Sequence, residues 1–459
     1  MPNNFEKYNE LRKKYKNFIY ENFKITNNKE EIILQFFFKI EGLAEFSPQI
    51  IIPKKNYILD EKIQFSEGFV FYIGMIELIS YWKSTCSPNV IIKCGKLNEE
   101  QINWFKKLYF YGLGELFFTN EIKNNITDFM NITCQSEKVW EVDNKCNNMK
   151  YDGYIFPIGG GKDSCVTIET LKQLNTNNYC LIVNPKPVTL NCAEVAGYSE
   201  DKIITINRKI DEELIKLNSQ GFINGHTPFS SLLAFLTYYI AFLTGKKYIA
   251  LSNENSSNES NVVGEKINHQ YSKSFEFEND FRNFVKKYLN TPVEYFSFLR
   301  PLNELQIASI FAQLEQYHKI FKSCNQGSKL KNWQWCCNCP KCMFVYIILS
   351  PFLYKQKLIN IFGEDLYERK DLLNTFIDLT GNGKTKPFEC VGTFEEVCFA
   401  ITKTISNLEQ ENKPLPYMLE YYKNNFKLSD LNNDLIKLYN TENNLNEEQN
   451  NILKSKIGG

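Results

Sequence analysis

The middle of the chain alternates between short apolar runs and segments in which apolar positions have helical spacing. The apolar runs are residues 153–159, 178–184, 201–207 and 246–253. Runs without polar alternation are typical of strands that are buried on both faces. The segments with helical spacing are residues 163–176, 210–218 and 228–244. This alternation predicts βαβ units and an α/β fold with a doubly wound parallel sheet, in which ligands bind beyond the carboxyl ends of the strands.

The first 148 residues show a mixed pattern that predicts an N-terminal α+β domain. Two expected strands and one expected buried helix are residues 30–42, 89–95 and 68–84. Another helix should begin after Asn98, because Gln101 follows three residues later, as in a capping box. The polar run at residues 141–153 predicts a linker between this domain and the next.

The remainder of the chain divides into a central and a C-terminal part. Residues 149–355 form the predicted central domain, and residues 356–459 form a predicted helical C-terminal region. Residues 440–459 are polar and contain few side chains that could enter a core. We therefore expect a solvated helix or a frayed end there.

Charge and composition narrow the classes of function. The 459 residues include 53 Lys and Arg and 53 Asp and Glu, whereas a protein that follows a nucleic-acid backbone usually has a basic excess. The N-terminus is charged and lacks an apolar signal segment. The longest apolar stretches, residues 69–82 and 230–245, are too short or too polar to span a bilayer. We expect a soluble cytoplasmic protein without membrane insertion and without nucleic acid as a partner.

A glycine-rich turn follows the first apolar run of the central domain. Its residues are Gly159, Gly160, Gly161, Lys162, Asp163 and Ser164. Glycines let backbone N–H groups approach an anion, and the N-terminus of a following helix adds positive partial charge. Lys162 would add a mobile cation and Ser164 a hydroxyl donor, while Asp163 suits a first helical turn or a magnesium site. The turn predicts a phosphate site, with an ordinary strand-to-helix turn as the alternative.

Two common phosphate-binding motifs do not describe this turn. A Walker A loop needs Gly in place of Phe156 and Ser or Thr in place of Asp163, and a dinucleotide fingerprint needs Gly in place of Ser164. The turn resembles the PP-loop of the ATP pyrophosphatases, usually SGGxDS, with Gly159 replacing the first Ser. That resemblance implies an adenine nucleotide alpha hydrolase-like fold. It also implies ATP and Mg²⁺ as cofactors, with cleavage between the α- and β-phosphates to give an adenylated substrate.

Five of the 14 cysteines lie within residues 324–342. Four of them combine CxxCxxC spacing with one upstream cysteine: Cys324, Cys336, Cys339 and Cys342. Four thiolates suit a structural zinc site, although Cys337 is a fifth candidate and free thiols are the alternative. The cluster also resembles the zinc knuckle of the 7-cyano-7-deazaguanine synthases, which are PP-loop enzymes too. That resemblance implies a structural Zn²⁺ that clamps the loop beside the active site.

Six further segments carry a more specific resemblance. They are residues 80–88, 107–118, 224–235, 250–262, 296–308 and 386–397. In their order they resemble the UDP-N-acetylmuramoyl-L-alanyl-L-glutamate epimerase (MurL) family, over most of residues 15–400. The resemblance implies an isomerase of peptidoglycan precursor synthesis. With ATP and Mg²⁺ it would invert the terminal L-Glu of UDP-MurNAc-L-Ala-L-Glu to D-Glu.

The implied chemistry suits a PP-loop, because adenylation neutralises the carboxylate beside Cα and makes the Cα proton easier to remove. Reprotonation from the other face then inverts the centre. The candidate catalytic residues are His226, His269 and Arg300, and the thiols of Cys86, Cys192 and Cys390 are alternatives for proton transfer. Arg300 could clamp a carboxylate or phosphate, or form a structural ion pair. Glu254 and Asn255 follow a predicted strand and could meet ribose, magnesium or substrate.

Other functions remain open from the sequence: a synthase of the 7-cyano-7-deazaguanine type, a tRNA-modifying adenylase, and a non-catalytic zinc-containing binding module. The synthase would be a shorter chain without the N-terminal domain. The tRNA enzyme would need a basic surface, and the binding module would not consume ATP. Neither the proton-transfer groups nor the oligomeric state can be identified from the sequence.

Overall fold

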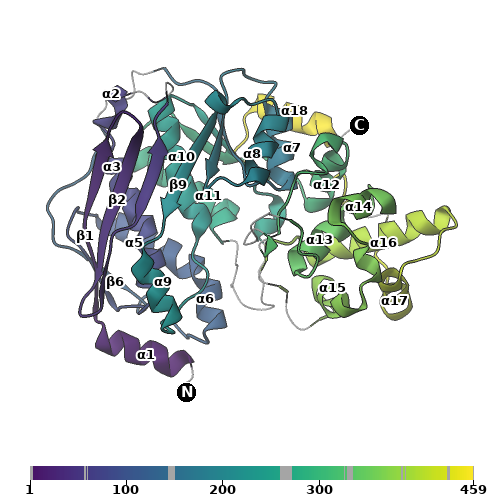
Figure 1. Ribbon diagram of the computed structural model, residues 1–459, viewed down its shortest axis with the longest axis horizontal. Helices are drawn as coiled ribbons and strands as arrows, with labels where there is room; N and C mark the ends of the chain where they lie inside the picture. The colour runs from purple at the N-terminus through teal and green to yellow at the C-terminus, as the bar shows by residue number, and fades with distance from the viewer. Residues whose placement is uncertain are drawn as a thin grey trace.

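The computed structural model describes residues 4–55, 58, 60–142, 150–258, 271–324, 326–327, 334–383, 386–387, 389–431 and 435–457. Within these residues, one sheet of eleven strands runs through the molecule (Figure 1). The strand order is β11-β10-β7-β8-β9-β4-β2-β1-β5-β6, and β3 pairs with β2.

The central strands form the predicted parallel sheet. They are β7 (Tyr154–Pro157), β8 (Tyr179–Val183), β9 (Ile203–Lys209), β10 (Tyr248–Leu251) and β11 (Glu294–Ser297). Each is parallel to its neighbours among these five. Successive side chains of a strand enter opposite cores, since Ile155 belongs to one hydrophobic cluster and Phe156 to another. The four predicted strands and the α/β class are confirmed, and β11 is a further strand that the apolar pattern did not reveal.

Helices cover both faces of these strands. Three occupy the segments with helical spacing: α7 (Lys162–Leu171), α9 (Glu212–Ser219) and α10 (Phe229–Thr244). Four others were not predicted: α8 (Pro187–Val195), α11 (Phe275–Tyr288), α12 (Glu304–Ala312) and α13 (Pro340–Leu349). α12 packs on both α7 and α13. Among the described residues, every helix is too short or too polar to cross a bilayer.

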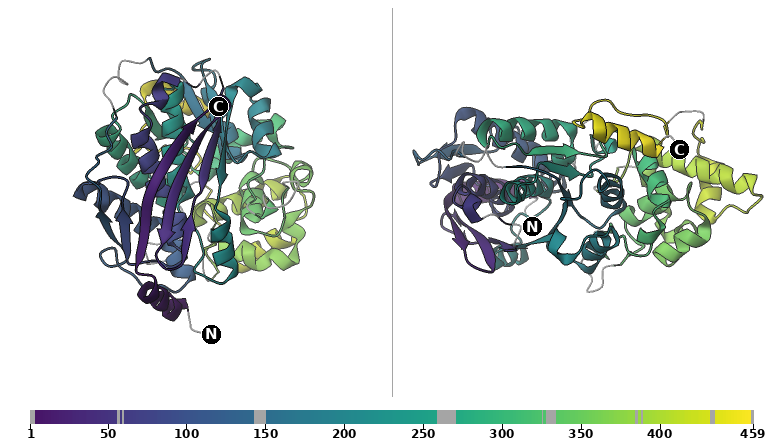
Figure 2. Two further views of the ribbon diagram at one scale, coloured as in Figure 1. Left: turned by 60° about the vertical axis from the view of Figure 1, so that its left-hand side comes forward. Right: turned by 90° about the horizontal axis from the view of Figure 1, so that it is seen from above.

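The N-terminal residues extend the same sheet. Their strands are β1 (Asn17–Asn27), β2 (Glu31–Ile40), β3 (Ala44–Phe46), β4 (Gln49–Pro53), β5 (Asn89–Ile92) and β6 (Asn131–Cys134). β4 pairs antiparallel with β9, with Gln49 opposite Lys209, so the ladder passes directly into the central strands. Figure 2 shows the N-terminal strands, in purple, beside the teal β9. The strand predictions at residues 30–42 and 89–95 correspond to β2 and β5.

The described N-terminal residues contain six helices. They are α1 (Asn4–Lys14), α2 (Asp60–Ile63), α3 (Glu67–Glu77), α4 (Ile79–Trp82), α5 (Glu99–Gly112) and α6 (Gly114–Thr119). The buried helix predicted at residues 68–84 is α3 followed by α4. The predicted capping box is present, since the Asn98 side chain accepts a hydrogen bond from the Gln101 N–H. Most of the predicted linker at residues 141–153 lies outside the described residues.

The C-terminal region is helical, as predicted. Its helices are α14 (Lys355–Phe362), α15 (Leu373–Leu379), α16 (Phe394–Gln410), α17 (Tyr417–Asn425) and α18 (Glu447–Ile457). α14 to α17 gather at the end of the molecule opposite the N-terminal strands in Figure 1 and in the right panel of Figure 2.

The expectation of a solvated or frayed tail is wrong. α18 returns to the central domain and packs on α7. The Leu453 side chain is fully buried there, and Gln449 Nε2 donates a hydrogen bond of 3.2 Å to the Tyr154 hydroxyl. One buried leucine and one buried amide on the same face hold an otherwise polar helix against the core.

We predict that Leu453→Ala lowers the free energy of unfolding by about 2–4 kcal/mol, because it removes buried apolar contact and leaves a cavity beside α7. Chemical denaturation measures this change. Lys456→Ala is the matched control, since Lys456 is an exposed residue of the same helix. A Leu453→Ala protein as stable as the control would show that α18 does not pack in solution as described here.

Candidate functional site

The strand order places a crevice at the glycine turn. The order β11-β10-β7-β8-β9 reverses direction between β7 and β10, and open parallel sheets bind ligands beyond the carboxyl ends of the strands at such a switch point. The glycine turn, residues 159–161, follows β7, and Glu254 follows β10. Two independently predicted segments therefore flank one crevice.

The backbone of the turn requires glycine at its centre. Gly160 has a φ of +81°, a region that side chains disfavour, and a Cβ there would lie 2.9 Å from Val188 Cγ1. A Cβ on Gly161 would lie 3.3 Å from the Ser323 Cβ, whereas one on Gly159 would meet no described atom within 4 Å. Gly161 is the N-cap of α7, so the first N–H groups of this ten-residue helix lie at the turn.

Lys162 is not the mobile cation that the sequence suggested. The residue is 1% exposed, and its ammonium group donates to the carboxylates of Asp163 and Glu304. Burial would lower the pKa of Lys162, but Asp163 and Glu304 raise it above its usual range. Lys162 joins α7 to α12 within the protein, and a direct contact with phosphate stays a prediction.

Further charged side chains surround this pair. We call Lys162, Asp163, Glu254, Lys273, Glu304 and Lys341 the charged cluster, because their charges act on one another. Burial alone would raise the pKa of Asp163, but Lys162, Lys341 and Lys273 hold it below its usual range. Asp163 therefore remains a carboxylate. Burial and the Asp163 charge raise the pKa of Glu254.

A second buried carboxyl group extends the charged cluster toward α16. Glu396 Oε1 accepts a hydrogen bond of 2.8 Å from the Glu304 N–H, and Glu396 Oε2 accepts one of 2.5 Å from the Thr393 N–H. Burial, opposed by Lys162, raises the pKa of Glu304 to about 7. Burial and the Glu304 charge raise the pKa of Glu396 to about 7.

Neither glutamate was singled out from the sequence, although a signal for both was present. Glu304 is the first residue of α12, which begins with an Asn303–Gln306 capping box. Glu396 completes the capping box that starts α16. The sequence shows that these two helices begin with acidic residues. It does not show that the helix starts lie close to Lys162 in space, so an ion pair with that lysine could not be predicted.

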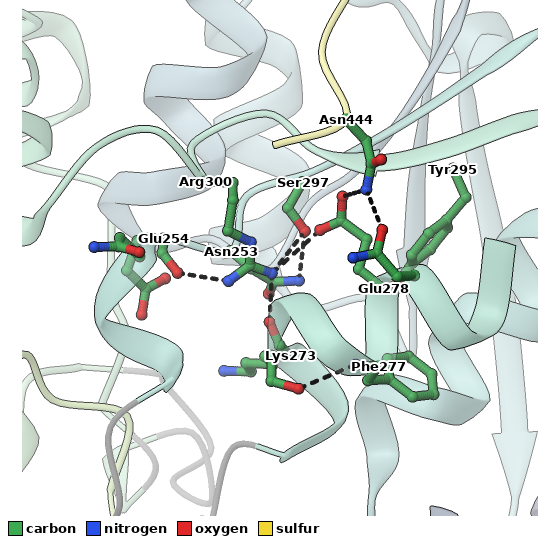
Figure 3. Close-up of polar contacts among 12 residues, drawn as sticks. Asn253, Glu254, Lys273, Phe277, Glu278, Tyr295, Ser297, Arg300 and Asn444 are labelled. Atoms are coloured by element: carbon green, nitrogen blue, oxygen red, sulfur yellow. Dashed lines mark hydrogen bonds and ion pairs between the residues drawn. The ribbon is translucent and has the colours of Figure 1, made fainter. Parts of the chain in front are cut away.

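The predicted site residue Arg300 supports the backbone of the crevice from behind. Its side chain is fully buried, and its guanidinium donates to the carbonyl oxygens of Glu254, at 2.8 Å, and Lys273, at 2.5 Å. It also forms an ion pair of 3.2 Å with Glu278, which accepts from Asn444. Figure 3 shows the guanidinium among these groups. Of the two roles open from the sequence, the geometry favours the structural ion pair.

Two other predicted nucleotide contacts lie at the crevice and are engaged by protein groups. The Ser164 hydroxyl donates a hydrogen bond of 2.9 Å to the Gly161 carbonyl. Asn255 Oδ1 accepts one of 2.8 Å from Asn440 Nδ2. Asn255 also lines a pocket of about 320 Å³ that reaches Glu396. Contact of either side chain with a nucleotide stays a prediction.

Of the two candidate histidines, His226 is not a member of the charged cluster. His226 precedes α10, and its Nδ1 lies 3.7 Å from Glu115 Oε2 on α6. That neighbourhood is formed by α6 and α10, whereas the charged cluster comes from α7, β10, α12 and the segments around Lys273 and Lys341. His269 lies outside the described residues.

The four predicted cysteine ligands converge, and their geometry fits a tetrahedral metal. Their Sγ atoms all lie within 4.8 Å of one another. The Cys324–Cys339 and Cys336–Cys342 distances are both 3.7 Å, and the Cys339–Cys342 distance is 3.5 Å. Tetrahedral zinc with bonds of about 2.3 Å requires sulfur separations of roughly 3.8 Å. Cys337 turns away, with its thiol 3.2 Å from the Phe362 carbonyl.

This cysteine quartet is tied to the glycine turn. Lys322, two residues before Cys324, donates its N–H to the Gly160 carbonyl at 2.8 Å. Ser323 packs against Gly161. Lys341, between Cys339 and Cys342, belongs to the charged cluster. A metal in the quartet would therefore fix the turn and one of the lysines of the charged cluster.

We predict one zinc per chain, held by the quartet for structural reasons, because four thiolates leave no open coordination position. Elemental analysis of protein purified without chelator measures it. Cys339→Ser should lose most of the metal and lower the melting temperature. Cys337→Ser is the matched control and should keep both, since Cys337 faces Phe362. Metal-free, fully stable wild-type protein would contradict the assignment.

We also predict a pH signature from Glu396, whose pKa rises from an ordinary value of 4.5 to about 7 on folding. The folded state then binds more protons than the unfolded state between pH 4.5 and 7, so this group's contribution to stability is lost as pH rises through that window. Relative to Glu396→Gln, wild-type protein should therefore lose stability from pH 5 to pH 8, by at most on the order of 3 kcal/mol.

Thermal denaturation across this pH range measures the difference. The Gln variant keeps only one acceptor oxygen for two N–H donors, so a constant offset between the proteins is expected and only its change with pH counts. Glu395→Gln, at an exposed neighbouring position, is the control and should run parallel to wild type. A parallel curve for Glu396→Gln would show that Glu396 is ionised at neutral pH.

Comparison with known proteins matches this chain to a family. Residues 9–298 match the family described as MurL N-terminal domain, and residues 320–427 match that described as MurL C-terminal domain. Three relatives carry the name UDP-N-acetyl-alpha-D-muramoyl-L-alanyl-L-glutamate epimerase. The Xanthomonas oryzae pv. oryzae protein is 31% identical over 73% of this chain and 74% of its own. The relative from a Micromonospora species is 32% identical over 71% and 72%.

The third relative, from Salinispora tropica, is 30% identical over 79% of each chain. The two family matches together include the glycine turn, Glu254, Glu396 and the cysteine quartet. The chain therefore belongs to the MurL family.

Proposed function

We propose that this protein epimerises the terminal L-Glu of UDP-MurNAc-L-Ala-L-Glu to D-Glu, with ATP and Mg²⁺, through an adenylated α-carboxylate. The substrate follows from the names of three relatives that align with more than two thirds of the chain. The observation that carries the use of ATP is the glycine turn at the switch point of the parallel sheet. A buried helix start there, with Asp163 and Ser164 in its first turn, supports a phosphate site.

Adenylation lowers the energetic cost of removing the Cα proton, which is the main difficulty of the reaction. An ionised carboxylate beside Cα opposes removal of the Cα proton, because a second negative charge would develop next to the first. Attack of that carboxylate on the α-phosphate releases pyrophosphate and removes this charge. The carbanion can then delocalise into the acyl group, be reprotonated on the other face, and return to the free acid when water releases AMP.

The charged cluster is suited to an anionic reactant. Lys162, Lys273 and Lys341 place three ammonium groups beside the start of α7. Asp163 stays ionised among them, and Glu254 is 8% exposed at the end of β10. Carboxylate oxygens are the ligands that Mg²⁺ prefers, so these two residues are the candidates to hold the magnesium of MgATP. The lysines would neutralise the part of the phosphate charge that Mg²⁺ does not neutralise.

The decisive experiment incubates purified protein with ATP, Mg²⁺ and UDP-MurNAc-L-Ala-L-Glu, and then quantifies AMP and the D-Glu content after hydrolysis. We expect both to form. Ser164→Ala should lower turnover at least tenfold while the melting temperature stays near that of wild type, because its hydroxyl lies at the turn. Ser219→Ala, at an exposed position of α9, is the control.

Two outcomes would contradict the proposal in different ways. Glutamate that stays wholly L while ATP is cleaved would exclude epimerisation and favour another adenylating reaction. D-Glu formed without any AMP would exclude the adenylate. Wild-type turnover by Ser164→Ala would remove the glycine turn from the proposed nucleotide site.

A further inference from the structure

We propose that the Cys390 thiol is one of the two groups that transfer the Cα proton, and that Lys273 is the positioning residue that stabilises its thiolate. This inference rests on the proposed function and goes beyond it, since it assigns one proton-transfer group. Lys273 Nζ lies 3.0 Å from Cys390 Sγ. The thiol is half-buried, in the segment that precedes α16.

A second lysine fixes the backbone of the same cysteine. The Lys341 ammonium, from the first turn of α13, donates to the Cys390 carbonyl oxygen. Lys273 and Lys341 both belong to the charged cluster and both act on Asp163 in the glycine turn. Cys390 is thus held by two members of the charged cluster, and these two also lower the pKa of the aspartate beside the proposed phosphate site.

The position of Lys273 is itself determined by Arg300. One guanidinium binds the carbonyl oxygens of Lys273 and Glu254, so the lysine is held relative to the carboxyl end of β10. Burial would lower the pKa of Lys273, but Cys390, Glu254 and Asp163 raise it above its usual range. Its ammonium form therefore persists, and an adjacent positive charge favours thiolate over thiol.

The sequence left three thiols as candidates for proton transfer, and the surroundings of Cys390 differ from those of the other two. The Cys86 side chain is fully buried, donates to the Lys83 carbonyl, and has a pKa raised by burial to about 12. Cys192 is 2% exposed and lies 3.8 Å from the sulfur of Cys165. Of these three cysteines, Cys390 combines partial exposure with a cation at hydrogen-bond distance.

The proposed step conserves protons and charge. In one direction the Cys390 thiolate takes the proton from Cα, leaving a thiol and the delocalised carbanion of the acyl adenylate. A group on the opposite face then donates a proton to that carbon. In the other direction Cys390 is the donor and becomes the thiolate. Both groups recover their starting protonation by exchange with water after AMP leaves.

The test follows AMP formation and deuterium at Cα separately, in heavy water, with Cys390→Ala. We expect AMP to form, while D-Glu formation falls by about 10²–10⁴-fold. If Cys390 faces the L-Glu proton, the recovered L-Glu stays undeuterated. If it faces the other side, deuterium enters L-Glu without inversion. Cys398→Ala is the control and should epimerise normally. Cys398 belongs to α16, and its thiol donates a hydrogen bond to the Thr380 carbonyl.

Deuterated D-Glu formed by Cys390→Ala at the wild-type rate would overturn this inference and leave the proposed function intact. Wild-type protein that makes no AMP would instead refute the proposed function. A second measurement needs no substitution at Cys390. Iodoacetamide should alkylate Cys390 of the folded wild-type protein faster than Cys398 and stop epimerisation while AMP still forms.

Lys273→Met should slow that alkylation, which a purely structural role for Lys273 would not do. Undiminished epimerisation by protein alkylated at Cys390, or faster reaction at Cys398 than at Cys390, would refute the assignment even if Cys390→Ala failed to fold.

Discussion

The arrangement of the crevice depends on the buried ammonium group of Lys162. A lysine that is 1% exposed is tolerated because two carboxylates, Asp163 and Glu304, neutralise it. Loss of one partner of such a pair costs about 3–5 kcal/mol, since the remaining charge stays buried without compensation. The N-terminus of α12 is thereby held against that of α7, and the hydrogen bond from Glu304 to Glu396 connects both to α16.

Two supports outside regular secondary structure complete the site. Arg300 orders the backbone after β10 by binding the carbonyl oxygens of Glu254 and Lys273. On the other side, the segment that leads into Cys324 binds the carbonyl of Gly160. The glycine turn itself carries no side chains. The groups that contact it come from segments that are distant in sequence. The proposed nucleotide site would use this arrangement, with backbone N–H groups close to the ligand and charged side chains fixed behind them.

Local patterns in the sequence were enough for six of the strands, for several helix starts and for the convergence of the cysteine quartet. The apolar runs of β7 to β10, the Asn98 capping box and the CxxCxxC spacing each depend on residues close together in the chain. The errors concern contacts over long separations. Lys162 appeared mobile because Glu304, which binds it, lies 142 residues away. The polar tail appeared solvated because its partner Tyr154 is 295 residues from Gln449.

The fate of the α-carboxylate oxygens of the terminal glutamate tests the central claim most directly. Substrate labelled with ¹⁸O in that carboxylate would be turned over in unlabelled water, and the AMP would be analysed by mass spectrometry. Adenylation followed by attack of water at the acyl carbon predicts that AMP carries one ¹⁸O atom from the glutamate. Unlabelled AMP together with D-Glu that retains both labelled oxygens would contradict adenylation followed by attack of water at the acyl carbon.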